Sequence, residues 1–207
     1  MIAAWDVTGR EPTLAWLTDT GTEVETFPGQ KASQVLLPML QQLEESTGQR
    51  ITKVGFIRGP GSFTGIRAGL ATAQGLRLSG RAETYAATAF DLLVPELDAD
   101  TTGILLPGSA GYGFTAVYED GRCVQAAEAR RLEDVSADIH WLCPFALPGL
   151  PEQVRTKVLD RHPVSFFPAR IAAASAEADQ NLEPFYVRPP DVRKGVPLIE
   201  QLLKGGS

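Results

Sequence analysis

Two stretches of this sequence carry groups that could hold a phosphate. Asp6-Val7-Thr8-Gly9 places a carboxylate and a hydroxyl where an apolar strand expected over 2–6 enters a turn. A glycine-rich run, 58–65, follows a second apolar strand and leads into an expected helix. A helix that starts after a tight loop presents unpaired N–H groups at the positive end of its dipole, which suits an anion. The candidate nucleotide- or phosphate-binding residues are Asp6, Thr8, Gly59, Gly61, Ser62, Thr64 and Gly65.

Both stretches also have a purely structural interpretation. The glycine run lacks the Gly-Lys-Ser/Thr ending of a P-loop and the Gly-x-Gly-x-x-Gly spacing of a dinucleotide fold. Asp6 and Thr8 can bond the backbone of their own turn, and Ser62 or Thr64 can cap the helix that follows. From the residues alone, a structural turn is slightly favoured over a phosphate cradle.

Other catalytic chemistry has little support. His140 and His162 are far apart and near no matched pair of metal ligands, and the spacing of Cys123 and Cys143 suits no metal site. Ser62 does not occupy a Gly-x-Ser-x-Gly elbow. We therefore expect no catalytic residue, no metal and no cofactor, with ATP and magnesium conceivable only at the interface with a partner.

The pattern of apolar residues predicts an α/β protein with two lobes, 1–100 and 101–207. An acidic, turn-rich stretch over 96–103 marks the boundary. The expected strands are 2–6, 14–18, 22–27, 51–57, 84–88, 103–106, 114–118 and 122–126. The expected helices are 32–46, with Ser33 as its cap, a second that runs to about 79, and 89–94, 152–160 and 171–179, with a final turn over 198–203.

Charge and hydropathy restrict the partners of the chain. The net charge of −6 argues against binding of nucleic acid by this chain alone, because that binding needs a basic face. The basic residues near the end, Arg188, Arg193 and Lys194, are expected to be a solvated tail. No stretch is apolar enough to cross a bilayer and no export signal is visible, so we expect no membrane contact and a cytoplasmic protein.

The expected second helix has a stripe of small residues. Gly65, Gly69 and Ala73 recur every four positions and so lie along one side of the helix. Glycine inside a helix costs about 1 kcal/mol relative to alanine, which is tolerable where another backbone must come close. The stripe favours a tightly packed neighbour, either within the chain or in another subunit.

The glycine run resembles a segment of the TsaB (YeaZ) family. Residues 58–67 are similar to its Gly-Arg-Gly-Pro-Gly-Ser-Phe-Thr-Gly-Leu-Arg segment, with Ile66 in place of leucine. Residues 32–38 match part of a His-Ser-Glu-x-Leu-Leu-Pro pattern of the same family. The resemblance implies an actin-like (ribonuclease H-like) fold of duplicated lobes, with the carboxyl lobe reduced and irregular.

The resemblance also implies a function. It is that of a noncatalytic scaffold or activating subunit in the synthesis of threonylcarbamoyladenosine on tRNA. The implied partners are a TsaD-like catalytic subunit, a TsaE-like ATPase and a second copy of the chain, with tRNA contacted only through the complex. The expected pairing surface comprises Leu36, Met39, Leu40, Leu43, Ile66, Gly69, Leu70 and Ala73.

The sequence departs from the family at two places. Val7 replaces a hydroxyl residue in the first turn, and the stretch 105–114 lacks the family's Asp-Ala-Arg. Any activity that relied on those groups should be absent, which agrees with a scaffold. The alternative function is that of a small actin-like ATPase or phosphotransferase that uses the glycine-rich loop.

Overall fold

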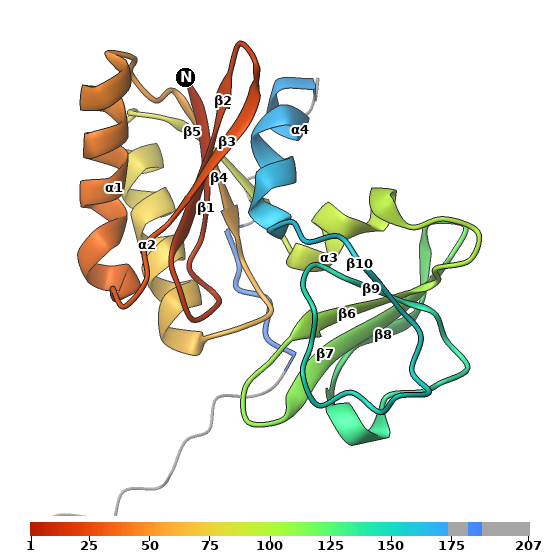
Figure 1. Cartoon of the computed structure of the whole chain (residues 1–207). Helices are drawn as coiled ribbons and strands as arrows, with labels where there is room; N and C mark the ends of the chain where they lie inside the picture. Colours follow the sequence, from red (N-terminus) through yellow and green to blue (C-terminus); the bar gives the residue numbers. More distant parts are fainter. Residues whose placement is uncertain (174–181, 188–207) are drawn as a thin grey trace, which may run out of the picture.

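Two five-stranded sheets, one in each lobe, organise the chain (Figure 1). The computed structural model describes residues 1–173 and 182–187. The first sheet has the order β3-β2-β1-β4-β5 and the second the order β8-β7-β6-β9-β10. The strands are β1 (Ile2–Asp6), β2 (Thr13–Thr18), β3 (Gly21–Thr26), β4 (Lys53–Ile57), β5 (Glu83–Ala87), β6 (Gly103–Pro107), β7 (Tyr112–Glu119), β8 (Arg122–Arg131), β9 (Trp141–Cys143) and β10 (Thr156–Val158).

The second sheet repeats the pairing of the first. Strand β1 is antiparallel to β2 and parallel to β4, and β6 is antiparallel to β7 and parallel to β9. In the first lobe, α1 (Ala32–Thr47) and α2 (Phe63–Leu78) connect the parallel strands. In the second lobe a single 3-10 turn, η2 (Leu132–Asp134), and a loop over 144–155 take their places. The duplicated actin-like architecture with a reduced carboxyl lobe is therefore confirmed.

Each lobe is also contacted by a helix that follows a strand of the other lobe. Helix α3 (Ala89–Leu93) and η1 (Val94–Glu96) follow β5, and α3 packs against β6 of the second sheet. Helix α4 (Phe167–Ala173), which follows η3 (Pro163–Phe166), packs on β1, β2 and β4, across the first sheet from α1 and α2 (Figure 1). One hydrophobic cluster contains residues of both sheets. A division after residue 100 thus falls between the sheets, although the lobes share a core.

Local sequence explains the ends of the two long helices. Helix α1 ends at Gly48, whose φ of 64° is the left-handed conformation that glycine adopts without strain. Helix α2 begins after Ser62, whose side chain accepts a hydrogen bond from the Gly65 N–H at 3.2 Å. The cap expected at Ser33 is wrong, because α1 starts after Lys31 and has no side-chain cap.

The sequence predictions are weaker in the second lobe. The helix expected over 152–160 is wrong, since this segment contains β10 and turns, and β9 was not predicted. Helix α4 begins four residues earlier than the expected start at Ile171. Residues 174–179 of the expected helix and the final turn expected over 198–203 lie outside the described residues. No helix in the described ranges is long and apolar enough to cross a membrane.

The small-residue stripe of α2 packs inside the chain. A Cβ at Gly65 would overlap the carbonyl oxygen of Val7, and one at Gly69 would lie 2.9 Å from Val7 Cγ2 and 3.1 Å from Trp5 Nε1. Ala73 is fully buried. The close neighbour is therefore strand β1 and the residue after it, not a helix of another subunit.

Most residues of the pairing surface expected from the sequence are buried in the isolated chain. Burial within the chain removes them from contact with a partner, and only Leu70 is partly exposed. The buried residues of that surface are Leu36, Met39, Leu40, Leu43, Ile66, Gly69 and Ala73.

Two glycine-to-alanine changes within α2 test this packing. Gly65→Ala should lower the free energy of unfolding by about 3 kcal/mol, because the new methyl group has no room beside Val7. Gly75→Ala, on the open side of the same helix, should raise it by about 1 kcal/mol through helix propensity. Urea denaturation followed by circular dichroism measures both, and equal effects would contradict the packing.

Candidate functional site

A cavity of about 480 Å³ lies between the two lobes. Its wall in the first lobe comes from the end of β1, the turn after it and the glycine loop. Its wall in the second lobe comes from the end of β6, the loop after β9 and the start of η3. The lining residues that carry polar side chains are Asp6, Thr8, Arg10, Glu11, Thr13, Thr26 and His162.

Asp6 and His162 meet in this cavity from opposite halves of the chain. The Asp6 side chain is 9% exposed, and its Oδ1 accepts a hydrogen bond from the Thr8 N–H at 2.7 Å. Asp6 Oδ2 lies 3.7 Å from His162 Nε2. His162 Nδ1 accepts the Val164 N–H at 3.3 Å, so the proton of the neutral imidazole belongs on Nε2. Burial lowers the pKa of His162 below its usual value, and the charge of Asp6 opposes this only in part.

The structure separates the phosphate-binding candidates into two groups. Asp6, Thr8 and Gly61 line the cavity, whereas Gly59, Ser62, Thr64 and Gly65 do not. Gly59 and Ser62 belong to the loop that precedes α2, and Thr64 and Gly65 belong to the first turn of that helix.

The glycine loop is held against the rest of the chain by hydrogen bonds and close contacts. The Ser62 N–H bonds the Thr8 carbonyl at 2.7 Å, and the Gly65 N–H is capped by Ser62. A Cβ at Gly61 would overlap the backbone of Thr8. The loop is therefore docked on the turn after β1, which agrees with its structural interpretation.

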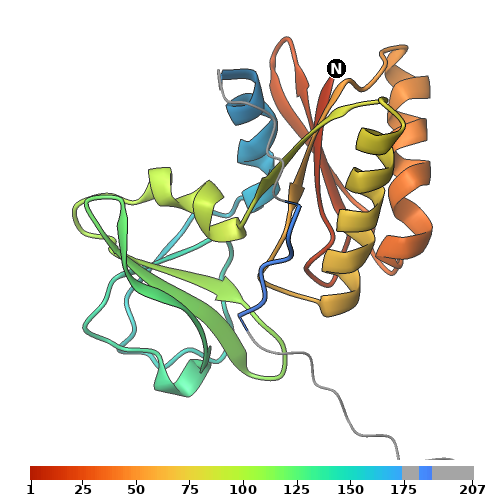
Figure 2. The same ribbon diagram turned by 180° about the vertical axis from the view of Figure 1, so that it is seen from behind.

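A segment near the end of the chain holds the other side of this loop (Figure 2). The Phe185 N–H bonds the Arg58 carbonyl at 2.8 Å, and the ring of Tyr186 lies 5.0 Å from that of Phe63. A Cβ at Gly59 would overlap the Phe185 carbonyl oxygen. Gly59 is thus needed for the close approach of Phe185, a contact that could not be predicted from the glycine run.

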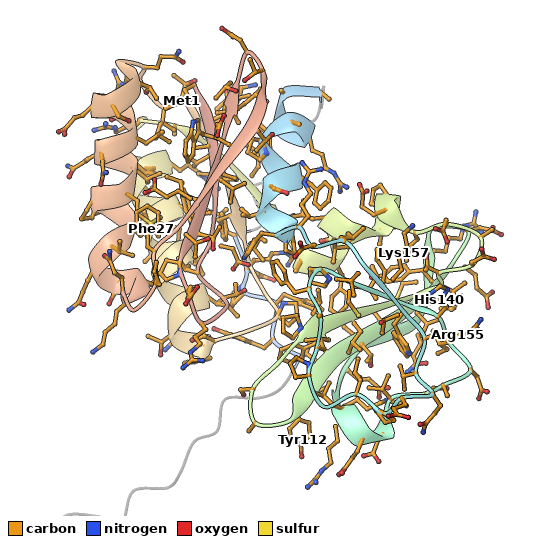
Figure 3. The ribbon with its side chains drawn as sticks, in the orientation of Figure 1. Met1, Phe27, Tyr112, His140, Arg155 and Lys157 are labelled. Carbon is orange, nitrogen blue, oxygen red and sulfur yellow. The ribbon has the colours of Figure 1, made fainter. Side chains whose placement is uncertain are left out.

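His162 is the cavity residue that sequence reasoning missed. No sequence pattern links His162 to Asp6, and only the fold brings the two side chains together. His140 lies instead on the second lobe near Arg155 and Lys157, away from α1 and α2 (Figure 3). Within the described ranges, no group of three or more His, Cys, Asp or Glu side chains could hold a metal ion.

The stretch without the family's Asp-Ala-Arg contributes only an apolar wall to the cavity. Leu106 and Pro107 line it at the end of β6. Gly108 packs so closely on the Tyr112 carbonyl group that a Cβ there would lie 3.0 Å from its carbon. In the part of the second lobe that the structure describes, His162 lines the cavity, and no carboxylate or arginine does.

The burial of His162 predicts a pH dependence of stability. Its pKa is lower in the folded chain than in the unfolded chain, so the unfolded chain binds more protons below about pH 6.5. The free energy of unfolding should therefore fall as the pH is lowered from 7 through that range. His162→Asn keeps an acceptor for the Val164 N–H and removes the titration. Urea denaturation at pH 7, 6 and 5 should show a smaller fall for this variant, and an equal fall would contradict the assignment.

Comparison with known proteins was made by family, by sequence and by structure. No family model matches the chain. The tRNA threonylcarbamoyladenosine biosynthesis protein TsaB of Escherichia coli (strain K12) is 45% identical over 49 residues. That match covers 22% of this chain and 21% of the E. coli protein.

Solved structures match over much more of the chain. YeaZ from Pseudomonas aeruginosa is 20% identical, with a TM-score of 0.61 over 89% of this chain and 98% of its own. A protein described as similar to the peptidase YEAZ from Pseudomonas aeruginosa is also 20% identical, with a TM-score of 0.63 over 90% of this chain and 99% of its own. The resemblance is confirmed: the chain is similar in sequence to E. coli TsaB over one segment and in fold to YeaZ over 89% of its length.

Proposed function

We propose that this chain is a noncatalytic subunit in the synthesis of threonylcarbamoyladenosine on tRNA. The observation that carries the proposal is the 45% identity over 49 residues to E. coli TsaB, whose name states a part in tRNA threonylcarbamoyladenosine biosynthesis. The shared fold with YeaZ over 89% of the chain supports it. The subunit acts in the cytoplasm beside a TsaD-like catalytic subunit and a TsaE-like ATPase.

The chemistry of the inter-lobe cavity supports a noncatalytic role. The donors of Ser62 and Gly65 are bonded within the chain, so they are not free to hold a phosphate. Among the described residues, the cavity also presents two carboxylates, Asp6 and Glu11, against a single arginine, Arg10. The excess of negative charge would repel a nucleoside triphosphate, which argues against the ATPase alternative.

Because the residues first expected to pair with a partner are buried, we propose a different pairing surface. It is the side of α1 and α2 that faces away from the first sheet. We define this outer helix face by Leu37 and Gln41 of α1 and Arg67, Ala71, Gln74 and Leu78 of α2, all of them exposed. The Leu37 and Leu78 side chains are large, apolar and 54% and 86% exposed. Burial of such groups by a second protein is favourable.

The shape of the outer helix face suits a close approach by another helix. Ala71 is small, and a Cβ added to Gly75 would meet no atom within 4 Å. Together they leave a low stretch between Arg67 and Leu78. A TsaD-like subunit with a related fold would present a matching pair of helices there. The net charge of −6 leaves tRNA to be held by that subunit.

A matched pair of alanine-to-arginine variants tests the pairing surface. Ala71→Arg should weaken binding to the TsaD-like subunit by about tenfold or more, because a long charged side chain would stand in the middle of the outer helix face. Ala126→Arg makes the same change at an exposed position of β8 and should leave binding unchanged. Surface plasmon resonance with the purified TsaD-like subunit gives both dissociation constants.

Further outcomes separate the alternatives. Equal binding by both variants would contradict the proposed surface, and a loss of self-association alone would assign that face to a second copy of the chain. Titration of the isolated chain with ATP and magnesium in a calorimeter tests the ATPase. Tight binding with turnover would favour that enzyme over the scaffold.

A further inference from the structure

The floor of the inter-lobe cavity holds a hydrogen-bond donor beside an acceptor. His162 Nε2 carries the imidazole proton, and Asp6 Oδ2 lies 3.7 Å from it, which is too far for a direct hydrogen bond. The other polar atom of each side chain is already bonded to the backbone, Asp6 Oδ1 to the Thr8 N–H and His162 Nδ1 to the Val164 N–H. Neither Nε2 nor Oδ2 has a hydrogen bond in the part of the chain that the structure describes. Both atoms are therefore fixed in position and available.

A hydroxyl group satisfies both atoms at once. Its oxygen can accept the Nε2–H of His162 while its own hydrogen is donated to Asp6 Oδ2. An oxygen about 2.8 Å from each atom fits across a gap of 3.7 Å. A carboxylate or phosphate oxygen has no hydrogen to donate and would face Asp6 as a like charge, and an ammonium group cannot accept from His162.

Other residues that line the cavity also favour a ligand that carries hydroxyl groups. Thr8 adds a hydroxyl group to the first-lobe side, where it can donate or accept. Phe145 and the rings of Pro107 and Pro163 line the opposite side and can cover the C–H face of a ligand. A volume of about 480 Å³ lies within the usual range for small-molecule sites.

We propose that the inter-lobe cavity binds an uncharged polyhydroxylated small molecule of the sugar class, one hydroxyl of which bridges Asp6 and His162. The ligand contacts both lobes and so holds them together. This site is separate from the outer helix face, and the proposal does not depend on the partner of that face.

D-ribose and D-ribose 5-phosphate form a matched pair of probes for this site. With the imidazole nitrogens labelled, NMR titration of the isolated full chain with D-ribose should shift the His162 resonances saturably, with a dissociation constant of about 1 mM. D-ribose 5-phosphate should bind at least tenfold more weakly, because its phosphate adds negative charge beside Asp6 and Glu11. Tighter binding of the phosphorylated sugar, or no saturable shift with D-ribose, would overturn the proposal.

Two carboxylate-to-amide variants locate the binding. Asp6→Asn keeps an oxygen for the Thr8 N–H but turns an amide donor towards His162, so it should weaken D-ribose binding at least tenfold. Asp138→Asn makes the same change at an exposed position outside the cavity and should bind D-ribose like the unaltered chain. Circular dichroism checks that both variants fold, and His162→Asn serves as a second cavity variant that should also lose binding. Equal affinities in the cavity variants and in Asp138→Asn would overturn the proposal.

Discussion

The structure depends on the close approach of the glycine loop and α2 to the end of strand β1. Gly61 lies against the Thr8 backbone, Gly65 against the Val7 carbonyl group and Gly69 against the side chains of Val7 and Trp5. The Ser62 N–H closes the contact with a hydrogen bond to the Thr8 carbonyl. Without a Cβ at these glycines, α2 can lie directly on the central strand of the first sheet. The position of Asp6 in the lining of the cavity follows from this contact, because the glycine loop and α2 fix the turn that begins at Asp6.

The duplicated topology explains why a cavity forms between the lobes and what faces it. In each lobe the first strand is central, so the ends of β1 and β6 both reach the gap between the sheets. Helices α3 and α4 close the two sheets onto one core and bring η3, with His162 before it, to the end of β1. The reduction of the second lobe removes its long helices, but its strand order still delivers Leu106 and Pro107 to the cavity wall.

The first lobe could be predicted well from the sequence because its elements are periodic and its ends are marked. Alternating apolar residues in the strands, the apolar spacing of α1 and the Ser62 cap each give a local signal, and the structure has β1, α1 and the end of α2 within two residues of the expected bounds. The second lobe gave weaker signals. Strands β9 and β10 have three residues each, and tertiary pairing, of β9 with β6 and of β10 with β9, decides their state more than their own sequence does. The contact between Asp6 and His162 could not be predicted, since no local pattern links residues that only the fold brings together.

The buried stripe of α2 shows why a sequence motif can indicate a family and still mislead about a surface. A run of small residues signals that something must approach closely, but the same pattern serves a strand of the chain itself or a helix of another subunit. Burial decides between them: Ile66 and Ala73 are almost wholly enclosed, whereas Leu78 on the same helix is 86% exposed. A helix that lies flat on its own sheet turns its opposite side outward as a consequence. The motif therefore constrains the partner surface only indirectly, by fixing the helix whose outer side a second protein could meet.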